Sequence, residues 1–485
     1  METVFTNDLW AVPDRYLFTD YASDVVLDMD PCMWATCKGS LGVFKILLNH
    51  CTKGKDSDME IRGIDSGGLL LLNEAARHGH VDIVRFLLNN QPRYSRIDER
   101  DANDCTALLS AAAARYIDRS TSLREELEAI ISLLLDQGAS ASDVSYWDEE
   151  LRNTVLTSAA EWAGSQLIKR LIDDGADIYT KVVRGRWEDK LWNLPEGSFE
   201  VNALYVACTH ANFEAVKSLI DCRGAEVEML DVIWQRDTLG SLPLHWVTQT
   251  CLPKESFGYS KEAVYDKARS ITDIIELLLD LDPTIINVSD KDGNTPLHYA
   301  TRGADASIQN TESQKPLHTL FRLEDGDEYR DYICKKSSVD PVTVLTLLAH
   351  GASPADIDMA GDTPLHIAAA NLEWADVVSL LLVHGADPAL PNLKGQTALH
   401  RAAGGTYLGR NKDYQAPERI RAQEDVFSRL VKAGGVELMD LTDAEGMKPG
   451  EISNRTRKAW KELDGPPKQT GNGSGRERGP RMHKI

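Results

Sequence analysis

Five histidines of this 485-residue chain recur in one short context. Imidazole is a common metal ligand and a general base near neutral pH, so such a set could carry chemistry. A metal or catalytic role requires the side chains to converge on one point. Whether they do depends on the elements that carry them. They are His245, His298, His318, His366 and His400, each preceded by leucine.

The clearest copy of this context, GDTPLHIAAANLEWADVVSLLLVHGAD at 361–387, predicts two short helices joined by a turn. Thr363 is suited to cap the first helix, and Pro364 is suited to its first position, where no backbone donor is needed. Gly385 is suited to the left-handed backbone that ends the second helix. Two helices this short cannot bury their apolar faces alone, so the unit has to stack on copies of itself.

The unit resembles the ankyrin repeat, whose TPLHxAA stretch matches residues 363–369 and whose GAD turn matches 385–387. Weaker copies in the same register extend over about residues 31–460. The resemblance implies an all-α ankyrin-repeat solenoid, built from stacked helix-turn-helix repeats with short β-hairpin fingers between them. We expect about nine to ten repeats, several of them irregular because of insertions.

Within such an array, the five histidines form a ladder instead of a cluster. Adjacent repeats stack at about 10 Å, the usual distance between packed helices. The resemblance implies that each histidine hydrogen-bonds across neighbouring turns, which makes it a structural residue like Thr363, Pro364 and Gly385. The sequence also lacks the HExxH, GxxxxGK[ST], GxGxxG and GxSxG motifs. We therefore predict no enzyme, no catalytic or metal-binding residue and no cofactor.

The repeats depart from the family pattern at several places. Pro296 and Gly303 are 7 residues apart, where the pattern has 20, so the repeat at 293–305 lacks 13 residues. Either this repeat has no second helix after Ala300, or an exon was misjoined in the gene model. Extra residues fall between the two helices of a repeat at 116–125, 251–270, 323–340 and 405–423. Segment 181–200 instead lengthens a finger between repeats.

Composition limits the classes of function and the cellular locations that the chain can have. The formal net charge of −22 disfavours general nucleic-acid binding. The eight cysteines include no CxxC pair, and no apolar run approaches the length of a membrane span. We expect an N-terminal leader or cap (1–30), the repeat array (31–460) and a disordered basic tail (461–485). A cytoplasmic location is expected, or a nuclear one if the tail acts as an import signal.

The long finger carries residue types that dominate protein-binding surfaces. Trp187 and Trp192 lie there beside two arginines, and tryptophan and arginine are enriched at binding hot spots. The alternative is that both tryptophans pack against neighbouring repeats. The next first helix is expected to bring two more side chains nearby. The candidate partner-binding set is Arg184, Arg186, Trp187, Trp192, Tyr205 and His210.

These observations predict a non-catalytic adaptor or scaffold that binds another protein through the concave face and the finger loops. The acidic chain favours a partner with a basic surface patch. One alternative is a nuclear regulatory cofactor that uses the basic tail. Another is a pathway accessory protein or an unorthodox enzyme, whose site would require the long inserts to meet over one pocket.

Overall fold

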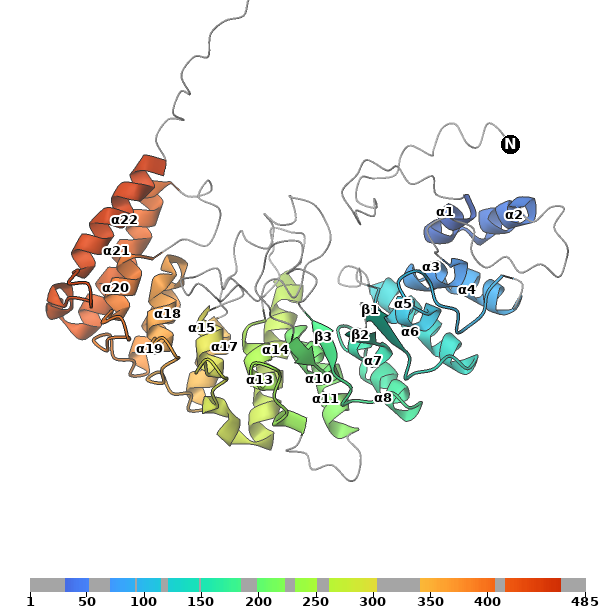
Figure 1. The fold of residues 1–485 in the computed structure, drawn as a ribbon, viewed down its shortest axis with the longest axis horizontal. Coiled ribbons are helices and arrows are strands. Elements are labelled where there is room, and N and C mark those ends of the chain that lie inside the picture. Colours follow the sequence, from blue (N-terminus) through green and yellow to red (C-terminus); the bar gives the residue numbers. More distant parts are fainter. Residues whose placement is uncertain are drawn as a thin grey trace, which may run out of the picture.

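Pairs of antiparallel helices stack side by side into a curved array in the computed structural model (Figure 1). The structure describes residues 31–51, 70–91, 94–114, 121–147, 150–184, 199–222, 232–250, 261–302, 341–405 and 415–463. Within these residues there are nine helix pairs and a closing helix. None of the helices in these ranges combines the length and apolarity needed to span a membrane.

The first helices of the pairs form one continuous row toward the inside of the curve, and each packs on the next (Figure 1). They are short and rich in alanine, which lets neighbouring helices approach closely. The row consists of α1 (Pro31–Lys38), α3 (Leu71–Arg77), α5 (Ala107–Ala112), α7 (Val155–Ala159), α10 (Ala203–Thr209), α13 (Pro243–Thr248), α15 (Pro296–Arg302), α18 (Pro364–Ala370), α20 (Ala398–Ala403) and the closing helix α22 (Pro449–Leu463).

The second helices form an outer row that covers the first. Their inward faces carry the leucine, isoleucine and valine side chains of the core, such as Ile83, Leu134 and Leu278, all buried. The row consists of α2 (Leu41–Cys51), α4 (Val81–Leu88), α6 (Thr121–Asp136), α8 (Ser165–Asp173), α11 (Phe213–Asp221), α14 (Lys261–Leu281), α17 (Pro341–Ala349), α19 (Ala375–Val383) and α21 (Ala416–Gly434). Short 3₁₀ helices at Pro283–Asn287, Leu372–Trp374 and Val436–Asp440 adjoin this row.

The helix ends in the repeat at 361–387 follow from local chemistry. The hydroxyl of Thr363 lies 2.8 Å from Nδ1 of His366, which also accepts the Thr363 backbone N–H. The cap therefore depends on the histidine side chain as well as on the threonine. Pro364 occupies the first helical position. Gly385, just after α19, has a φ of +90°, the left-handed conformation that favours glycine.

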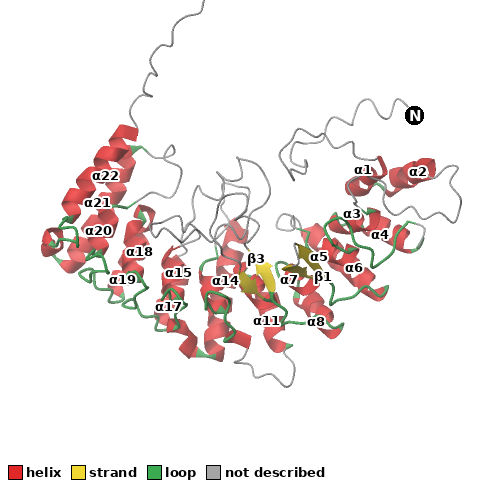
Figure 2. Ribbon diagram, in the orientation of Figure 1, coloured by secondary structure: helices red, strands yellow, loops and turns green. Residues whose placement is uncertain are grey.

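Two β-hairpins occur in the middle of the array, where they are the yellow elements of Figure 2. β1 (Val144–Trp147) pairs with β2 (Glu150–Thr154) before α7, and β3 (Val182–Arg184) pairs with β4 (Phe199–Val201) before α10. Both pairs are antiparallel, and β2 lies against β3. The fingers thus become true hairpins at these two places.

The expectation that the repeat begun at Pro296 has no second helix is wrong. Helix α17 packs against α15, α14 and α19, which is the position of the missing helix. Asn287, after α14, also bonds to the turn that follows α17: its Nδ2 donates to Gly351 O at 3.2 Å. The chain therefore completes this repeat after a long insertion at 303–340. Spacing along the sequence could not show this, because it assumes that paired helices are close in sequence.

The inserts between first and second helices are attached along one edge of the array, at the ends of α5, α13, α15 and α20. These helices begin at the turns between repeats, which form the opposite edge. We call the edge with the inserts the insert edge, and the edge formed by the turns between repeats the tip edge. The inserted residues 115–120, 251–260, 303–340 and 406–414, the leader 1–30 and the tail from 464 lie outside the described residues.

Substitutions at two glycines of the tip edge distinguish the effect of backbone strain from that of steric crowding. Gly361 and Gly385 both have positive φ, +75° and +90°. A Cβ on Gly361 would lie 2.7 Å from the backbone nitrogen of Leu393, whereas nothing lies within 4 Å of one on Gly385. We expect Gly385→Ala to lower the free energy of unfolding by about 1 kcal/mol through strain alone. Gly361→Ala should cost at least twice as much, as measured by urea denaturation.

Gly404→Ala serves as the control, since Gly404 has an ordinary φ of −85° and its nearest contacts are 3.9 Å away. Equal losses for Gly361→Ala and Gly385→Ala would show that the turns at the tip edge are not closely stacked.

Candidate binding surface

Side chains three residues after the helix cap connect several repeats to the next, and we call them rungs. Nδ1 of His366 accepts the backbone N–H of Thr363 at 3.1 Å, within its own turn. Its Nε2 lies 3.0 Å from the carbonyl oxygen of Gln396, just before the cap of the next repeat. The same bridge is made by His245 to Asn294 (3.2 Å), His298 to Asp362 (3.1 Å) and His400 to Met447 (3.2 Å).

These histidines lie in separate repeats, each bonded to backbone, and they do not converge. The rung after His298 is His366, because His298 bonds to the turn that directly precedes α18. His318 lies outside the described residues. Burial lowers the pKa of His245 and of His298 to about 4, and it also lowers the pKa of His366 and His400. The rungs are therefore neutral at pH 7, as a side chain that both accepts and donates requires.

Two further rungs are not histidines. Tyr205 is 1% exposed, and its hydroxyl donates to Ser241 O at 2.9 Å, just before the cap of α13. Asn73 donates to Cys105 O at 2.7 Å, just before the cap of α5. The prediction that Tyr205 contacts a partner is therefore wrong, because its side chain is buried and bonds to the next turn. Its position relative to Asn202, three residues after the cap, is the sequence signal that identifies it.

The finger is placed only at its base. Val182 pairs with Val201 and Arg184 with Phe199, so the two strands hold the ends of the segment together. The Lys181 ammonium lies 3.5 Å from Arg236 O in the next turn, which ties the base to the tip edge. The side chain of Arg184 and all of Arg186, Trp187 and Trp192 lie outside the described residues. Their role in binding stays a prediction.

His210 lies away from the finger. The strand β4 enters α10 at its first turn, whereas His210 follows the last residue of that helix. A helix of this length separates its ends by about 10 Å. At the insert edge, His210 lies 3.8 Å from the Glu161 carboxylate, and its carbonyl oxygen accepts from Lys267. The expectation that His210 lies beside the finger is therefore wrong for the base of the finger, and for Trp187 and Trp192, which lie outside the described residues, it stays a prediction.

The tips of neighbouring turns are joined by backbone hydrogen bonds. Met359 N donates to Asp292 O at 2.8 Å, and Leu393 N donates to Ala360 O at 3.0 Å. The same bond links Lys291 to Leu239 and Ala444 to Lys394, at 2.8 and 2.9 Å. Each turn is closed by a carboxylate or amide at its first position, as where Asp358 Oδ1 accepts from the Asp362 N–H at 2.9 Å. Five successive tips thus form one rigid row.

Three apolar side chains stand out from this row, and we call them the tip stripe: Ile357, Met359 and Leu393. They are 57%, 68% and 77% exposed. Met359 and Leu393 occupy the same position of adjacent turns, and Leu393 N bonds to the carbonyl oxygen of Ala360, the residue after Met359. Single exposed apolar residues are ordinary, but several held together on a rigid edge are typical of a binding surface. These residues were not predicted from the sequence, where nothing in the pattern shows that they are exposed.

Two large aromatic side chains on the first helices, Trp246 and Tyr299, are buried and bond to the turns. Trp246 Nε1 donates to Asp237 Oδ2 at 2.9 Å, and the Tyr299 hydroxyl donates to Asp290 Oδ2 at 2.7 Å. Both rings are buried. They stabilise the turn carboxylates, so in this part of the array the exposed apolar surface lies on the tips and not on these helices.

One group in the described ranges has the donor types and proximity to hold a metal ion: Cys37, Glu74 and His78. Burial, helped by the charge of Glu74, raises the pKa of the Cys37 thiol to about 12. Burial acts against ionisation of Glu74, but His78 and Arg77 outweigh it and lower its pKa. No sequence motif marks this group, because its members come from two helices.

The low pKa of the rung histidines predicts a pH dependence of stability. Above pH 6.5, the ordinary pKa, His298 is neutral in both states and its stabilisation is fully present. Between 6.5 and about 4 the unfolded chain binds a proton that the folded chain does not, so the free energy of unfolding falls. His298→Gln should lower stability near pH 7 by about 2 kcal/mol, through lost buried hydrogen bonds, and should flatten this dependence.

Urea denaturation at about pH 7.5 and about pH 5 measures both effects. His384→Gln, at an exposed histidine after α19, is the control and should leave the pH dependence as in the parent chain. An unchanged slope in His298→Gln would contradict the role of the rung.

Comparison with known proteins gives an independent view of these features. A family model described as "Ankyrin repeats (3 copies)" matches residues 32–126 and 332–409. These ranges include α1 to α5 at one end of the array and α17 to α20 toward the other. A search of curated proteins found no match. Ankyrin repeats are generally protein–protein interaction modules and are typically not enzymes. The chain contains ankyrin repeats, and its fold is an all-α ankyrin-repeat solenoid.

Proposed function

We propose that this protein is a non-catalytic adaptor that binds a partner protein along its tip edge. The observation that carries the proposal is the tip stripe: Ile357, Met359 and Leu393 expose apolar side chains at two adjacent turns of a hydrogen-bonded row. Apolar side chains of this size gain free energy when a partner removes them from water, at about 25 cal/mol per Å².

Rigidity makes this edge suitable for binding. The backbone of each tip is bonded to its own turn carboxylate or amide and to the neighbouring tip. Association therefore orders little of the chain, and most of the contact free energy remains as affinity. A flexible loop with the same side chains would lose part of that free energy in becoming ordered.

Charge defines the partner further. The chain has 75 acidic and 53 basic residues. A protein with this excess attracts basic surfaces and repels acidic ones, which speeds encounter with the former and excludes the latter. We propose a partner that presents apolar side chains flanked by lysine or arginine.

The base of the finger lies at the same edge. β3 and β4 precede α10 in the way that the tip turns precede α13, α15, α18 and α20. Trp187 and Trp192 are proposed as additional contacts. The cytoplasmic or nuclear location stays a prediction.

A site formed by the inserts is the less favoured function. Their attachment points follow α5, α13, α15 and α20, and α7 and α10 separate the first of these from the second while α18 separates the last two. The anchors are therefore spread along the array, whereas a catalytic pocket needs its groups to converge.

The proposal predicts that the double variant Met359→Asp with Leu393→Asp loses the partner. Two charges on the tip stripe would have to be desolvated on binding, so we expect recovery of the partner to fall more than about ten-fold. Stability should change by less than about 0.5 kcal/mol, since both side chains are exposed. The measurement is quantitative co-purification with the intact chain, followed by titration of the identified partner.

Val383→Asp is the matched control. Val383 is 81% exposed and apolar, but it lies on the outer helix α19. Its replacement should leave binding unchanged. Equal recovery of the partner by the double variant and by Val383→Asp would overturn the assignment of the tip edge.

A further inference from the structure

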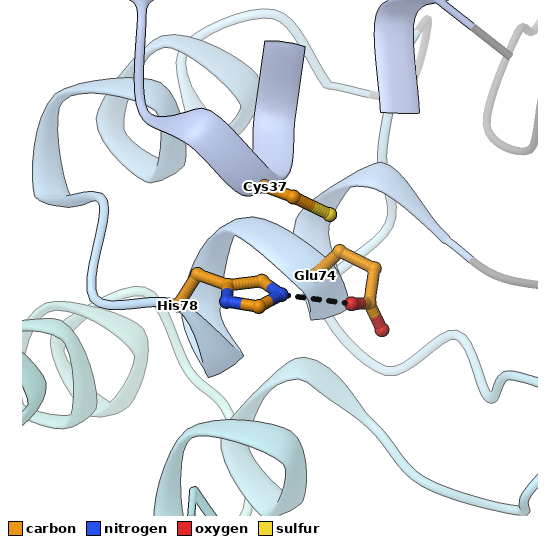
Figure 3. Close-up of side chains that lie close together, drawn as sticks. All are labelled: Cys37, Glu74 and His78. Atoms are coloured by element: carbon orange, nitrogen blue, oxygen red, sulfur yellow. Dashed lines mark ion pairs between the residues drawn. The ribbon is translucent and has the colours of Figure 1, made fainter. Parts of the chain in front are cut away.

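Three potential metal ligands from two repeats meet between α1 and α3 (Figure 3). Cys37 comes from the last turn of α1, and Glu74 and His78 come from α3. The last two are four residues apart, which places them on one face of the helix. Their ligand atoms all lie within 4.8 Å of one another. His78 Nε2 lies 3.5 Å from Glu74 Oε2.

Glu74 is the unusual member of the group. Its side chain is 1% exposed, yet its Oε1 accepts no hydrogen bond. The nearest cation is the Arg77 guanidinium, 3.6 Å away, and Nε2 of His78 likewise makes no hydrogen bond. Buried carboxylates normally accept several hydrogen bonds, because desolvating the charge is costly. A cation bound closer than Arg77 would give Oε1 of Glu74 the partner that it lacks.

We propose that Cys37, Glu74 and His78 bind a zinc ion that joins the first helix pair to the second. Thiolate, imidazole and carboxylate are the ligands that zinc takes in proteins. Bonds of about 2.0–2.3 Å to a tetrahedral ion place its ligand atoms about 3.3–3.8 Å apart, so a side-chain movement of about 1 Å closes the group. Binding displaces the proton of the Cys37 thiol to solvent, and water fills the fourth position.

The surroundings can accommodate the ion. Arg77 also lies 3.9 Å from the carboxylate of Asp101, whose Oδ2 is buried and accepts no hydrogen bond. When the ion binds the Glu74 carboxylate, Arg77 no longer has to neutralise Glu74 and can form its ion pair with Asp101. The last turn of α1 is held as well, since Nε2 of His80 lies 2.9 Å from Cys37 O. The ligand from α1 is thus positioned against α3 before the ion binds.

The ion would act as a clasp for the first described repeat. Among the described residues, α1 and α2 contact a neighbouring repeat on one side, and Ile46 of α2 is 64% exposed. In stacked repeats, stability comes from each interface with a neighbour, so a terminal pair is held less firmly than an inner one. A bond between Cys37 and α3 through zinc strengthens the single interface that holds it.

The test is a titration of the full chain, freed of metal with a chelator, with Co²⁺. We expect one Co²⁺ ion per chain and a sulfur-to-metal charge-transfer band in the near ultraviolet, which Zn²⁺ abolishes by displacement. Cys37→Ser should remove the band. Glu74→Gln and His78→Gln should weaken the apparent affinity more than about ten-fold, since even losing a partner of a ligand has an effect of that size.

Cys222→Ser is the matched control: Cys222 is a partly buried free thiol after α11 and should leave the band intact. Absence of the band in the parent chain, or its persistence in Cys37→Ser, would overturn the proposal.

A second measurement needs no variant. Zn²⁺ should slow backbone hydrogen exchange in 31–38 and 71–78 by more than about ten-fold, and leave exchange in α21 unchanged. Uniform slowing, or none, would contradict a clasp between α1 and α3. Because the group is at the opposite end of the array from the tip stripe, loss of metal should leave partner binding unchanged, so the two proposals can fail separately.

Discussion

The rung is the interaction on which the rest of this structure depends. In four repeats a histidine accepts from its own cap and donates to the carbonyl oxygen before the next cap, as His298 does between Thr295 and Asp362. Asn73 and Tyr205 make the second of these bonds in two more repeats. This couples the start of one first helix to the start of the next. Such a bond is buried, so it has to be satisfied at both ends, and that requirement fixes the distance between adjacent turns. Stacking of the apolar helix faces alone would tolerate sliding.

The rung also explains where the tips change form. Wherever a rung reaches the next cap, the turn there has one length: an aspartate or asparagine at its first position accepts from the fifth, as at 237–241, 290–294, 358–362, 392–396 and 443–447. The rung positions of α5 and α7 are Leu109 and Thr157, which are apolar or too short to reach. The repeats after them begin with β1–β2 and β3–β4 instead. Backbone pairing and the contact of β2 with β3 replace the missing side-chain bond.

The sequence pattern predicted those parts of the fold that residues close together in the chain determine, such as the helix ends. Thr363, Pro364 and Gly385 specify helix ends through the backbone next to them, and the sequence around them was sufficient to infer stacked helix pairs. Tyr205 was misassigned because an aromatic side chain suggests binding, although its offset from Asn202 is that of a rung. The pairing of α15 with α17 was missed because the two are far apart in sequence and meet only through packing. The group at Cys37 was missed because it depends on a contact between two repeats, which no spacing along the sequence encodes.

The two edges of the array follow from the same constraint. At the tip edge, a rung has to meet a carbonyl oxygen at a fixed position, so residues cannot be added inside the turn without breaking a buried bond. At the insert edge, the links between first and second helices differ widely in length, from the three residues 78–80 to the 38 residues 303–340, and loop closure becomes only slowly more costly with length. The 38 residues at 303–340 are therefore compatible with α15 and α17 remaining packed. The finger at 181–200 is accommodated differently: its ends pair as β3 and β4, in a repeat that Thr157 already leaves without a rung. The rigid edge is thus the one able to present a fixed surface, and the permissive edge is the one where sequence can be added without disturbing it.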